Sequence, residues 1–518
     1  MDHPAPRQPE NTTTPSIKKI AIAASVAAVF LQLGSFIFNG DCAVTGLMAL
    51  HISQLKEFPL YFWGAHYGGT LSSYIAAVLF AVFGVSKTAG ALSAILIAWL
   101  WIISLYTLAS RVLSPAGALA VFLLCLFPPV HILQYSMYFA PSYAEALACS
   151  GILFLFAARR LSARPMRPGL YYFLAGAAAG FGLWLSPGVL PASAGVLIFF
   201  AAAEKKDFWK TCLPYFSIGV AVGYVPALAY NLEYPYAALY RLGGRLFNLD
   251  RSFLGEPHKA AVLAGKVIGK ILAGPQNLFK LPVSYMEAAG LLNLALLAAS
   301  AALAVKEAAG RIKANIFPAP ADIAVVHTAL FAAFYAFVLS APAGFRYAVP
   351  LYAAAPLLLG RLFELGRAHN RKMAALILAA VICVNISTVV NTLARKPLND
   401  IDELAAHLER TGLKYAFSDY ETAYLVTFLT KEAVVVSPTL NHADFFDRYP
   451  EYTRQVRSGS EPAFIINAVL APSQAGSALG RLRELNVGFQ KDSVGGFLVL
   501  SRLSRKVYPE ELGLQVRK

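Results

Sequence analysis

The sequence predicts an all-α, multi-spanning membrane protein that ends in a small α/β domain. Hydrophobic residues fill 57% of its 518 positions and charged residues only 14%, whereas soluble proteins average about 25% charged residues. Charge-free stretches recur, and several approach the roughly 20 residues needed to cross about 30 Å of hydrocarbon. They cover residues 20–38, 88–110, 113–135, 146–158, 169–203, 211–232, 288–305, 323–345, 347–360 and 373–394.

The distribution of basic residues predicts the topology. Lys18-Lys19 places the N-terminal tail, residues 1–19, in the cytoplasm, because basic residues accumulate in cytoplasmic segments. About 11–13 transmembrane helices then fit within residues 20–394. Alternation puts a first outer loop, 39–87, and a large outer loop, 231–285, outside. The apolar run 71–86 inside the first loop is predicted to be re-entrant or interfacial rather than a full span.

Two further features of the membrane part follow from local sequence. Ser186-Pro187-Gly188 interrupts the stretch 169–203, which predicts two helices joined by a turn. The formal net charge is +15, but the basic residues cluster between apolar runs, so the charge reports topology rather than nucleic-acid binding. The large outer loop is basic against this trend. Either the topology differs locally or the positive charge has a use, and we favour the second interpretation.

The composition becomes that of a soluble domain over residues 395–518. This domain is predicted to be extracytoplasmic, because alternation places everything after the last span outside. Helices and strands alternate along it, which indicates an α/β fold. No phosphate-binding glycine loop occurs in it, and the five dispersed cysteines form no zinc or disulfide pattern. The predicted helices are 402–410, 422–429 and 475–485, and the predicted strands are 414–417, 433–436, 463–466, 487–490 and 497–501.

The first outer loop carries the residues best suited to chemistry. Asp41 directly follows the first span and precedes a helical pattern. It can cap that helix or serve as a general base at the membrane boundary. His51 and His66 suit sugar or metal binding, although a lone histidine is more often a hydrogen-bonding residue. Trp63 and Tyr67 suit an interfacial belt, stacking on a sugar ring or lining an isoprenoid groove. These residues alone leave the alternatives open.

Several motifs resemble one family. The runs Gly-Leu-Met-Ala-Leu-His at 46–51, Phe-Pro-Leu-Tyr-Phe-Trp-Gly at 58–64 and Tyr-Gly-Gly at 67–69 are similar to the first outer loop of GT-C superfamily membrane glycosyltransferases. Within it, the chain most resembles the polyprenyl-phosphate-sugar transferases related to protein O-mannosyltransferases and lipid A aminoarabinose transferase. A soluble C-terminal domain fits many members. Shorter matches follow at residues 143–145, 223–226, 230–231 and 346–351.

The resemblance implies an inverting glycosyltransferase. It would move a sugar from a polyprenyl-phosphate donor to a lipid, glycan or protein acceptor on the periplasmic or exoplasmic face. Asp41 is then expected to deprotonate or orient the acceptor hydroxyl. Many relatives carry an Asp-Glu pair here, whereas this chain has Asp41-Cys42. The second acid is therefore missing locally, and a divalent cation, which that acid would help to bind, is left open. Glu145, at the outer end of a span, is expected to be the second catalytic acid. Its alternative role is a solvated residue at a helix start.

A departing lipid phosphate calls for fixed positive charge. Arg346, at the outer boundary of the predicted spans, is the best candidate to bind it, against the alternative of snorkelling to lipid headgroups. Tyr347 follows it and is a candidate substrate contact. Arg241, Arg245 and Lys280 in the large outer loop are weaker candidates for the donor phosphate.

Two rival functions remain at this point. A transporter or flippase of a lipid-linked glycan would place charged residues in mid-span and pair broken helices in two related halves. The spans hold mainly His131 and His327, and no internal repeat is evident. A scaffold would use the outer domain to bind a partner. We expect a bacterial or archaeal plasma-membrane enzyme whose partners are the lipid-linked donor, its acceptor and the bilayer.

Overall fold

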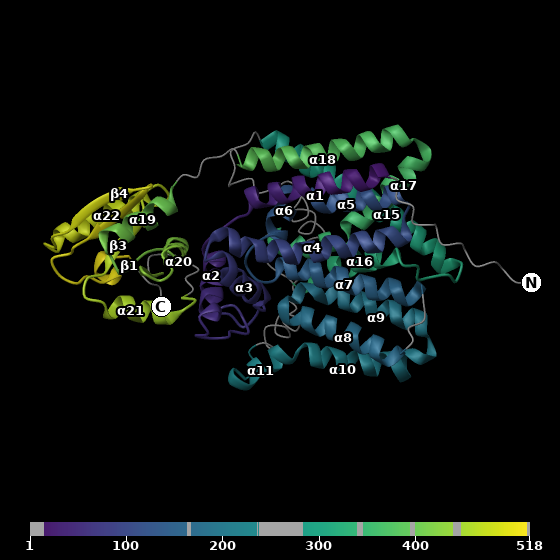
Figure 1. The fold of residues 1–518 in the computed structure, drawn as a ribbon, viewed down its shortest axis with the longest axis horizontal. Helices are drawn as coiled ribbons and strands as arrows, with labels where there is room; N and C mark the ends of the chain where they lie inside the picture. Colours follow the sequence, from purple (N-terminus) through teal and green to yellow (C-terminus); the bar gives the residue numbers. More distant parts are fainter. Residues whose placement is uncertain are drawn as a thin grey trace, which may run out of the picture.

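A bundle of apolar helices makes up most of the molecule, and the computed structural model describes residues 15–162, 167–235, 237, 283–338, 345–393, 399–438 and 447–514. The short helices α2 (Gly40–Ser53) and α3 (Leu71–Phe83) lie between this bundle and the C-terminal unit (Figure 1). The bundle contains α1 (Pro15–Ser35), α4 (Lys87–Val112), α5 (Pro115–Leu126), α6 (Val130–Ser136), α7 (Tyr143–Ser162), α8 (Pro168–Leu185), α9 (Leu190–Glu204), α10 (Leu213–Gly223), α11 (Val225–Glu233), α15 (Val283–Lys313), α16 (Asp322–Val338), α17 (Ala355–His369) and α18 (Arg371–Leu393), with short η1 (Pro187–Val189), η2 (Phe208–Cys212) and η3 (Phe345–Ala353).

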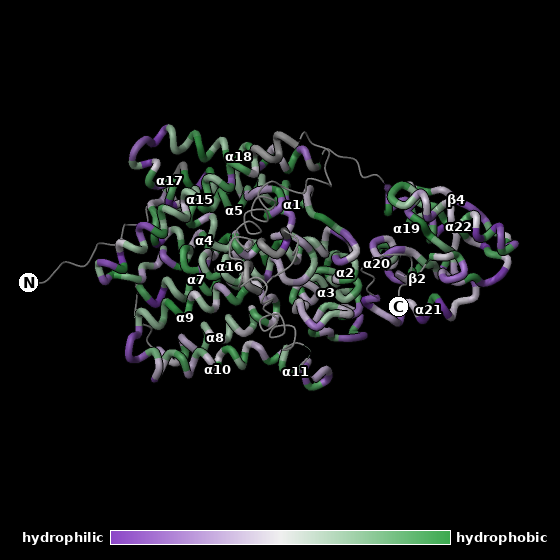
Figure 2. The backbone as a smooth tube through the Cα atoms, turned by 180° about the vertical axis from the view of Figure 1, so that it is seen from behind, coloured by the Kyte–Doolittle hydropathy of each residue, from purple (hydrophilic) through white to green (hydrophobic). Residues whose placement is uncertain are grey.

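The bundle is that of a multi-pass membrane protein. By length and apolar composition, 5 of the described helices suffice to cross a membrane, or up to 7 if each of two bent pairs is one span. Other helices, such as α7 and α8, run alongside them (Figure 1). Hydrophilic turns gather at the bundle end that lies away from the C-terminal unit (Figure 2). The five helices are Ile17–Ser35, Lys87–Val112, Pro187–Glu204, Ala289–Lys313 and Arg371–Asn391.

One local prediction about the membrane part is confirmed, and a second, for residues 71–86, stays a prediction. The charge-free stretch 169–203 forms α8 and α9, and η1 lies at the predicted turn. Helix α3 has 13 residues, which span about 20 Å at about 1.5 Å per residue, less than the hydrocarbon thickness. It packs against α2 and α4, as a re-entrant or interfacial segment would.

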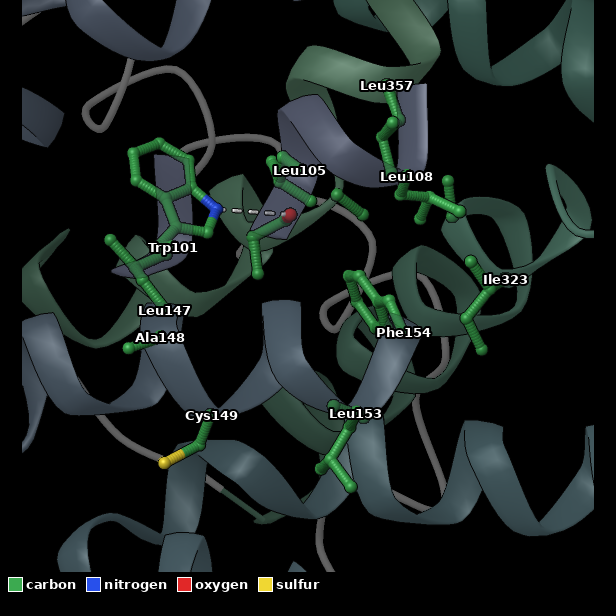
Figure 3. Packing of buried hydrophobic residues seen from close by; sticks show 14 of the residues in the cluster. Trp101, Leu105, Leu108, Leu147, Ala148, Cys149, Leu153, Phe154, Ile323 and Leu357 are labelled. Carbon is green, nitrogen blue, oxygen red and sulfur yellow. Dashed lines mark hydrogen bonds between the residues drawn. The ribbon is translucent and has the colours of Figure 1, made fainter. Parts of the chain in front are cut away.

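The interior of the bundle is a dense apolar core centred on α4 and α7 (Figure 3). Leu105 and Leu108 of α4 and Leu153 and Phe154 of α7 are fully buried within it. Trp101 is buried too, and its indole N–H donates to the Ala353 carbonyl at 3.4 Å, which ties α4 to the end of η3. The partner is needed because an indole N–H left without an acceptor in a dry interior costs free energy.

Helices α8 and α10 pack at backbone contact. A Cβ atom on Gly176 or Gly180 of α8 would lie 2.0 or 2.1 Å from a carbonyl oxygen of α10, and one on Gly219 or Gly223 of α10 would lie 2.1 Å from a carbonyl of α8. Each pair is spaced by four residues, so it lies on one helix face. Small residues at this spacing let membrane helices approach closely, where dispersion forces hold them together.

The C-terminal unit is a five-stranded mixed sheet with helices, in the strand order β2-β1-β3-β5-β4. β1 is parallel to β2 and to β3, while β5 is antiparallel to β3 and β4. The predicted strand 487–490 begins later than expected, as β4. The elements are α19 (Ile401–Thr411), β1 (Tyr415–Phe417), α20 (Tyr420–Leu429), β2 (Val435–Ser437), α21 (Pro450–Ser458), β3 (Ala463–Asn467), α22 (Pro472–Glu484), β4 (Gln490–Val494), β5 (Phe497–Ser501) and η4 (Pro509–Leu512).

The C-terminal unit docks on α2 through a shared apolar core. Residues of α2 and α3, the loop between them and the sheet unit belong to one buried cluster. Helix α20 lies directly on α2, where a Cβ on Gly46 would come within 2.5 Å of the Phe428 ring. Trp63 stacks on Tyr449 with ring centroids 4.2 Å apart. Because this core is continuous, the unit is fixed to the membrane part rather than tethered by its linker.

A buried charge network also links the membrane part to the C-terminal unit. His51 is only 4% exposed, and its Nδ1 and Nε2 lie 2.6 and 2.7 Å from carboxylate oxygens of Glu57 and Glu432. Glu432 also accepts from Tyr452 at 2.7 Å and from Lys56 at 3.1 Å. Burial alone would lower the pKa of His51, but its hydrogen bonds to the two carboxylates outweigh this and raise the pKa. Only the imidazolium form can donate to both.

The glycine contact between α8 and α10 generates a test. Gly180→Ala should destabilise the protein by about 1–3 kcal/mol, because the added Cβ forces two backbones apart. Gly310→Ala is a matched control, since nothing lies within 4 Å of a Cβ built there. It should be neutral or stabilising, because alanine favours helices by about 1 kcal/mol over glycine. The measurement is thermal unfolding in detergent, and equal effects of the two changes would contradict the close contact.

The His51 network predicts a pH dependence of stability. Because the folded pKa of His51 is raised, the stabilisation is complete below the ordinary histidine pKa of about 6.5. It should be lost as the pH rises through the folded pKa. The unfolding temperature of the full chain should therefore fall over this range, and His51→Gln should make that slope shallower. The part of the slope that comes from the raised pKa of Glu421 should remain. His407→Gln serves as the control and should keep the full slope. A slope of unchanged size in His51→Gln would show that His51 does not contribute to it.

Candidate active site

One edge of the sheet supplies polar residues to the docking interface. Tyr420 and Glu421 begin α20, which follows β1, and Arg448 lies in the segment between β2 and α21. Because β1 and β2 are parallel neighbours, their carboxyl ends meet at the same sheet edge, where α/β proteins commonly place their sites. Asp419 caps α20 by accepting from the Thr422 N–H at 3.0 Å. The sheet thus presents all three side chains to α2.

Asp41 lies in the first turn of α2, opposite this edge. The helix cap proposed above as an alternative role for Asp41 is made by Asn39, whose side chain accepts from the Cys42 N–H at 3.3 Å. The half-buried Asp41 carboxylate instead accepts a 2.6 Å hydrogen bond from the Tyr420 hydroxyl. Burial and the charge of Asp41 raise the pKa of Tyr420. The phenol therefore keeps its proton and orients the carboxylate.

Arg448 brings a positive charge to the same place. Its Nε donates to the Tyr420 hydroxyl at 3.3 Å, and its guanidinium lies over the rings of Phe62 and Tyr420, at 4.9 and 5.9 Å from their centroids. It also interacts electrostatically with Asp41 and Tyr67. The three residues Asp41, Tyr420 and Arg448, which we call the interface triad, join a carboxylate, a phenol and a guanidinium. Arg448 and Tyr420 were not predicted from the sequence.

A second carboxylate stands beside Asp41, and it comes from the C-terminal unit. The backbone N–H of Gly40 donates to Oε2 of Glu421. Partial burial at the interface raises the pKa of Glu421; the Gly40 N–H partly offsets this, and the charge of Asp41 adds to the rise. Glu421 thus places a second carboxylate near Asp41.

Glu145 lies at the same end of the bundle but in other surroundings. It is 1% exposed, and its Oε2 accepts from the Ser142 N–H at 3.1 Å at the start of α7. Ser142 in turn donates to the Leu185 carbonyl at 3.2 Å. Glu145 therefore interacts with the start of α7 and with Ser72 of α3, whereas the Asp41 carboxylate contacts α20.

The aromatic candidates of the first outer loop divide into two groups. His51 and Trp63 lie in the docking core, where His51 is held by two carboxylates and Trp63 stacks on Tyr449. His66 and Tyr67 are exposed. The Nδ1 of His66 lies 2.8 Å from the Tyr230 hydroxyl. Of these four candidates, His66 and Tyr67 are the two whose side chains are exposed.

Of the four candidates for binding the donor phosphate, Arg346 is the one within the described residues. Arg346 lies in the first turn of η3 and is half-buried. A Cβ on Gly188 would lie 2.8 Å from Pro350 of η3, so η3 lies beside the α8–α9 turn at the same bundle end as Glu145. Tyr347 belongs to η3, but its side chain is outside the described residues, as are Arg241, Arg245 and Lys280.

No group of three or more histidine, cysteine, aspartate or glutamate side chains that could hold a metal occurs in the described ranges. Asp41 and Glu421 supply two carboxylates, and Arg448 adds a positive charge beside them. The interface triad is therefore suited to orienting a hydroxyl or binding an anionic group.

Comparison with known proteins identifies the fold. The sequence matches no family model and no curated protein. Two crystal structures of ArnT from Cupriavidus metallidurans are similar over nearly the whole chain. The apo structure has a TM-score of 0.59 and 12% identity over 94% of this chain and 98% of that one. The structure bound to undecaprenyl phosphate has a TM-score of 0.60 and 12% identity over 95% and 99%. The chain therefore has the GT-C fold of ArnT, which confirms the resemblance predicted from the first outer loop.

Proposed function

We propose that this protein is an inverting GT-C glycosyltransferase that takes a sugar from a polyprenyl-phosphate donor. The observation that carries the proposal is the interface triad, in which Tyr420 and Arg448 hold Asp41 where the bundle meets the C-terminal unit. The fold supports it, since one ArnT structure contains undecaprenyl phosphate. A lipid-linked donor also suits the architecture, because its tail can remain among apolar helices while the sugar reaches a polar boundary.

Each residue of the triad has a role in the proposed reaction. Asp41 accepts the proton of the acceptor hydroxyl as that oxygen bonds to the anomeric carbon. The bond from that carbon to the lipid phosphate breaks at the opposite face, so the configuration inverts. Tyr420 fixes the direction of the carboxylate. The departing phosphate gains negative charge, and a guanidinium that is already in place stabilises such charge without reorganisation. Arg448 and Arg346 are the candidates.

The proposal also says on which side of the membrane Asp41 lies and which parts of the chain form the site. With Lys18-Lys19 in the cytoplasm, the single crossing by α1 places Asp41 on the outer face. Residues 20–394 would form the transferase part and residues 395–518 an extracytoplasmic unit that completes the site. A sugar donor that is already lipid-linked needs no nucleotide pocket on that face. The acceptor is a lipid, glycan or protein that reaches this boundary.

Asp41→Asn tests the base. Removing the carboxylate charge should lower kcat by about 10²–10⁴, the usual contribution of a positioned general base, without lowering the unfolding temperature by much. Asp492→Asn, on the exposed strand β4, should leave transfer unchanged. The assay follows sugar transfer from polyprenyl-phosphate donors in membranes. Full activity of Asp41→Asn would refute the role of this residue.

Arg448→Gln tests the contribution of the C-terminal unit. Loss of the guanidinium should reduce kcat/KM by about 10²-fold, the effect expected when one preorganised donor to developing negative charge is removed. Arg454→Gln is the control, because that side chain is 75% exposed on α21 and pairs with Glu451. The two variants are compared for transfer and for unfolding temperature. If both change transfer equally, the proposed role of Arg448 is wrong.

A further inference from the structure

A second candidate site lies at the opposite end of the bundle. Helix α4 begins at Lys87, whose Nζ pairs with Asp402 of the C-terminal unit at 2.6 Å. The helix runs for 26 residues, about 39 Å at about 1.5 Å per residue, so Arg111 in its last turn lies a membrane thickness away. Helix α8 ends at Leu185, whose carbonyl accepts the Gly69 N–H at 3.2 Å. Its start, after Arg167, is therefore at the far end as well.

A groove of about 610 Å³ opens at this far end between α4, α7 and α8. Arg111, Arg159 and Arg167 line it, one from each helix or its cap. The phenol of Tyr171 also lines the groove and lies within electrostatic reach of Arg111 and Arg159. Three guanidinium groups from separate elements thus converge on one opening.

The rest of the groove is apolar. Ile152, Leu155 and Phe156 of α7 and Leu170 and Leu174 of α8 form its walls. Leu170 and Leu174 are 50% and 47% exposed, and they lie on a helix of the membrane bundle, where exposed apolar side chains face lipid. The groove therefore combines a basic rim with a wall suited to a hydrocarbon chain.

The charge of these three arginines is not balanced by acids within the described part of the chain. Other arginines at this end are paired: Arg160 with Glu204, Arg311 with Asp322 and Arg361 with Glu307. By contrast, none of the three groove arginines forms an ion pair with a described residue. A cluster of unneutralised guanidinium groups at a membrane boundary is complementary to a phosphate headgroup, which it can bind through bidentate hydrogen bonds.

We propose that this groove binds an anionic phospholipid, with the phosphate at the three arginines and one acyl chain along the α7 and α8 wall. The lipid would belong to the leaflet opposite the proposed active site, which is the cytoplasmic leaflet if Asp41 faces outward. The site is separate from the interface triad and does not depend on glycosyl transfer.

The test uses the purified full chain in detergent. Native mass spectrometry measures binding of phosphatidylglycerol and of phosphatidylcholine with the same acyl chains. The wild type should prefer phosphatidylglycerol. The variant Arg111→Gln/Arg159→Gln/Arg167→Gln should lose affinity for it on the order of a hundredfold, at roughly fivefold per basic residue. Leu174→Trp keeps all three charges but fills the groove, and it should also weaken binding of the lipid.

The matched control is Lys205→Gln/Lys206→Gln/Lys210→Gln. It removes the same charge from exposed residues at the same bundle end and should keep the preference for phosphatidylglycerol. The proposal is overturned if this control loses as much affinity as the arginine variant, or if the wild type shows no preference. Complete displacement of the lipid by millimolar inorganic phosphate would assign a simple phosphate-ion site and overturn it too. Transfer activity is not read out, so the result is independent of the proposed function.

Discussion

The close approach of α20 to α2 determines which side chains of the C-terminal unit reach Asp41. It depends on two glycines of α2, since a Cβ on Gly40 would lie 2.9 Å from the Tyr420 ring and one on Gly46 would lie 2.5 Å from Phe428. With both side chains absent, the two helices meet closely enough for the Tyr420 hydroxyl to reach Asp41. The shared apolar core and the buried His51 network then hold this contact in place.

Elements that are marked by a pattern of neighbouring residues could be predicted from the sequence. Charge-free runs predicted the membrane helices, Ser186-Pro187-Gly188 predicted the break between α8 and α9, and the alternating pattern after residue 395 predicted most of the C-terminal strands and helices. The first-loop motifs predicted the GT-C fold. Helix α21 was missed because it is short and strongly polar, although Pro450 marks its first turn, where proline is favoured.

The partners of Asp41 could not be predicted in the same way. Tyr420 lies 379 residues from Asp41 in the chain, and no periodicity or spacing links positions that far apart. Parity arguments could show only that Glu145 and Arg346 share an end of the bundle with Asp41, not which side chain touches it. His51 illustrates the same limit: its two ring nitrogens are taken by acids, one of which, Glu432, belongs to the distant C-terminal unit. For the contact between α8 and α10, in contrast, the sequence does carry a signal: the Gly-xxx-Gly spacings that begin at Gly176 and Gly219 predict close helix packing.

Tyr420 and Arg448 both lie in segments that follow strands, after β1 and β2 respectively. This placement affects which substitutions the fold can tolerate. The sheet unit has one buried cluster of its own and the membrane bundle has another, in addition to the core that the sheet unit shares with α2 and α3. Changes in the segments after the strands can therefore alter what approaches Asp41 while both scaffolds remain intact. Under the proposed function, a few substitutions in these segments would alter which acceptor reaches Asp41, without any change in the membrane helices.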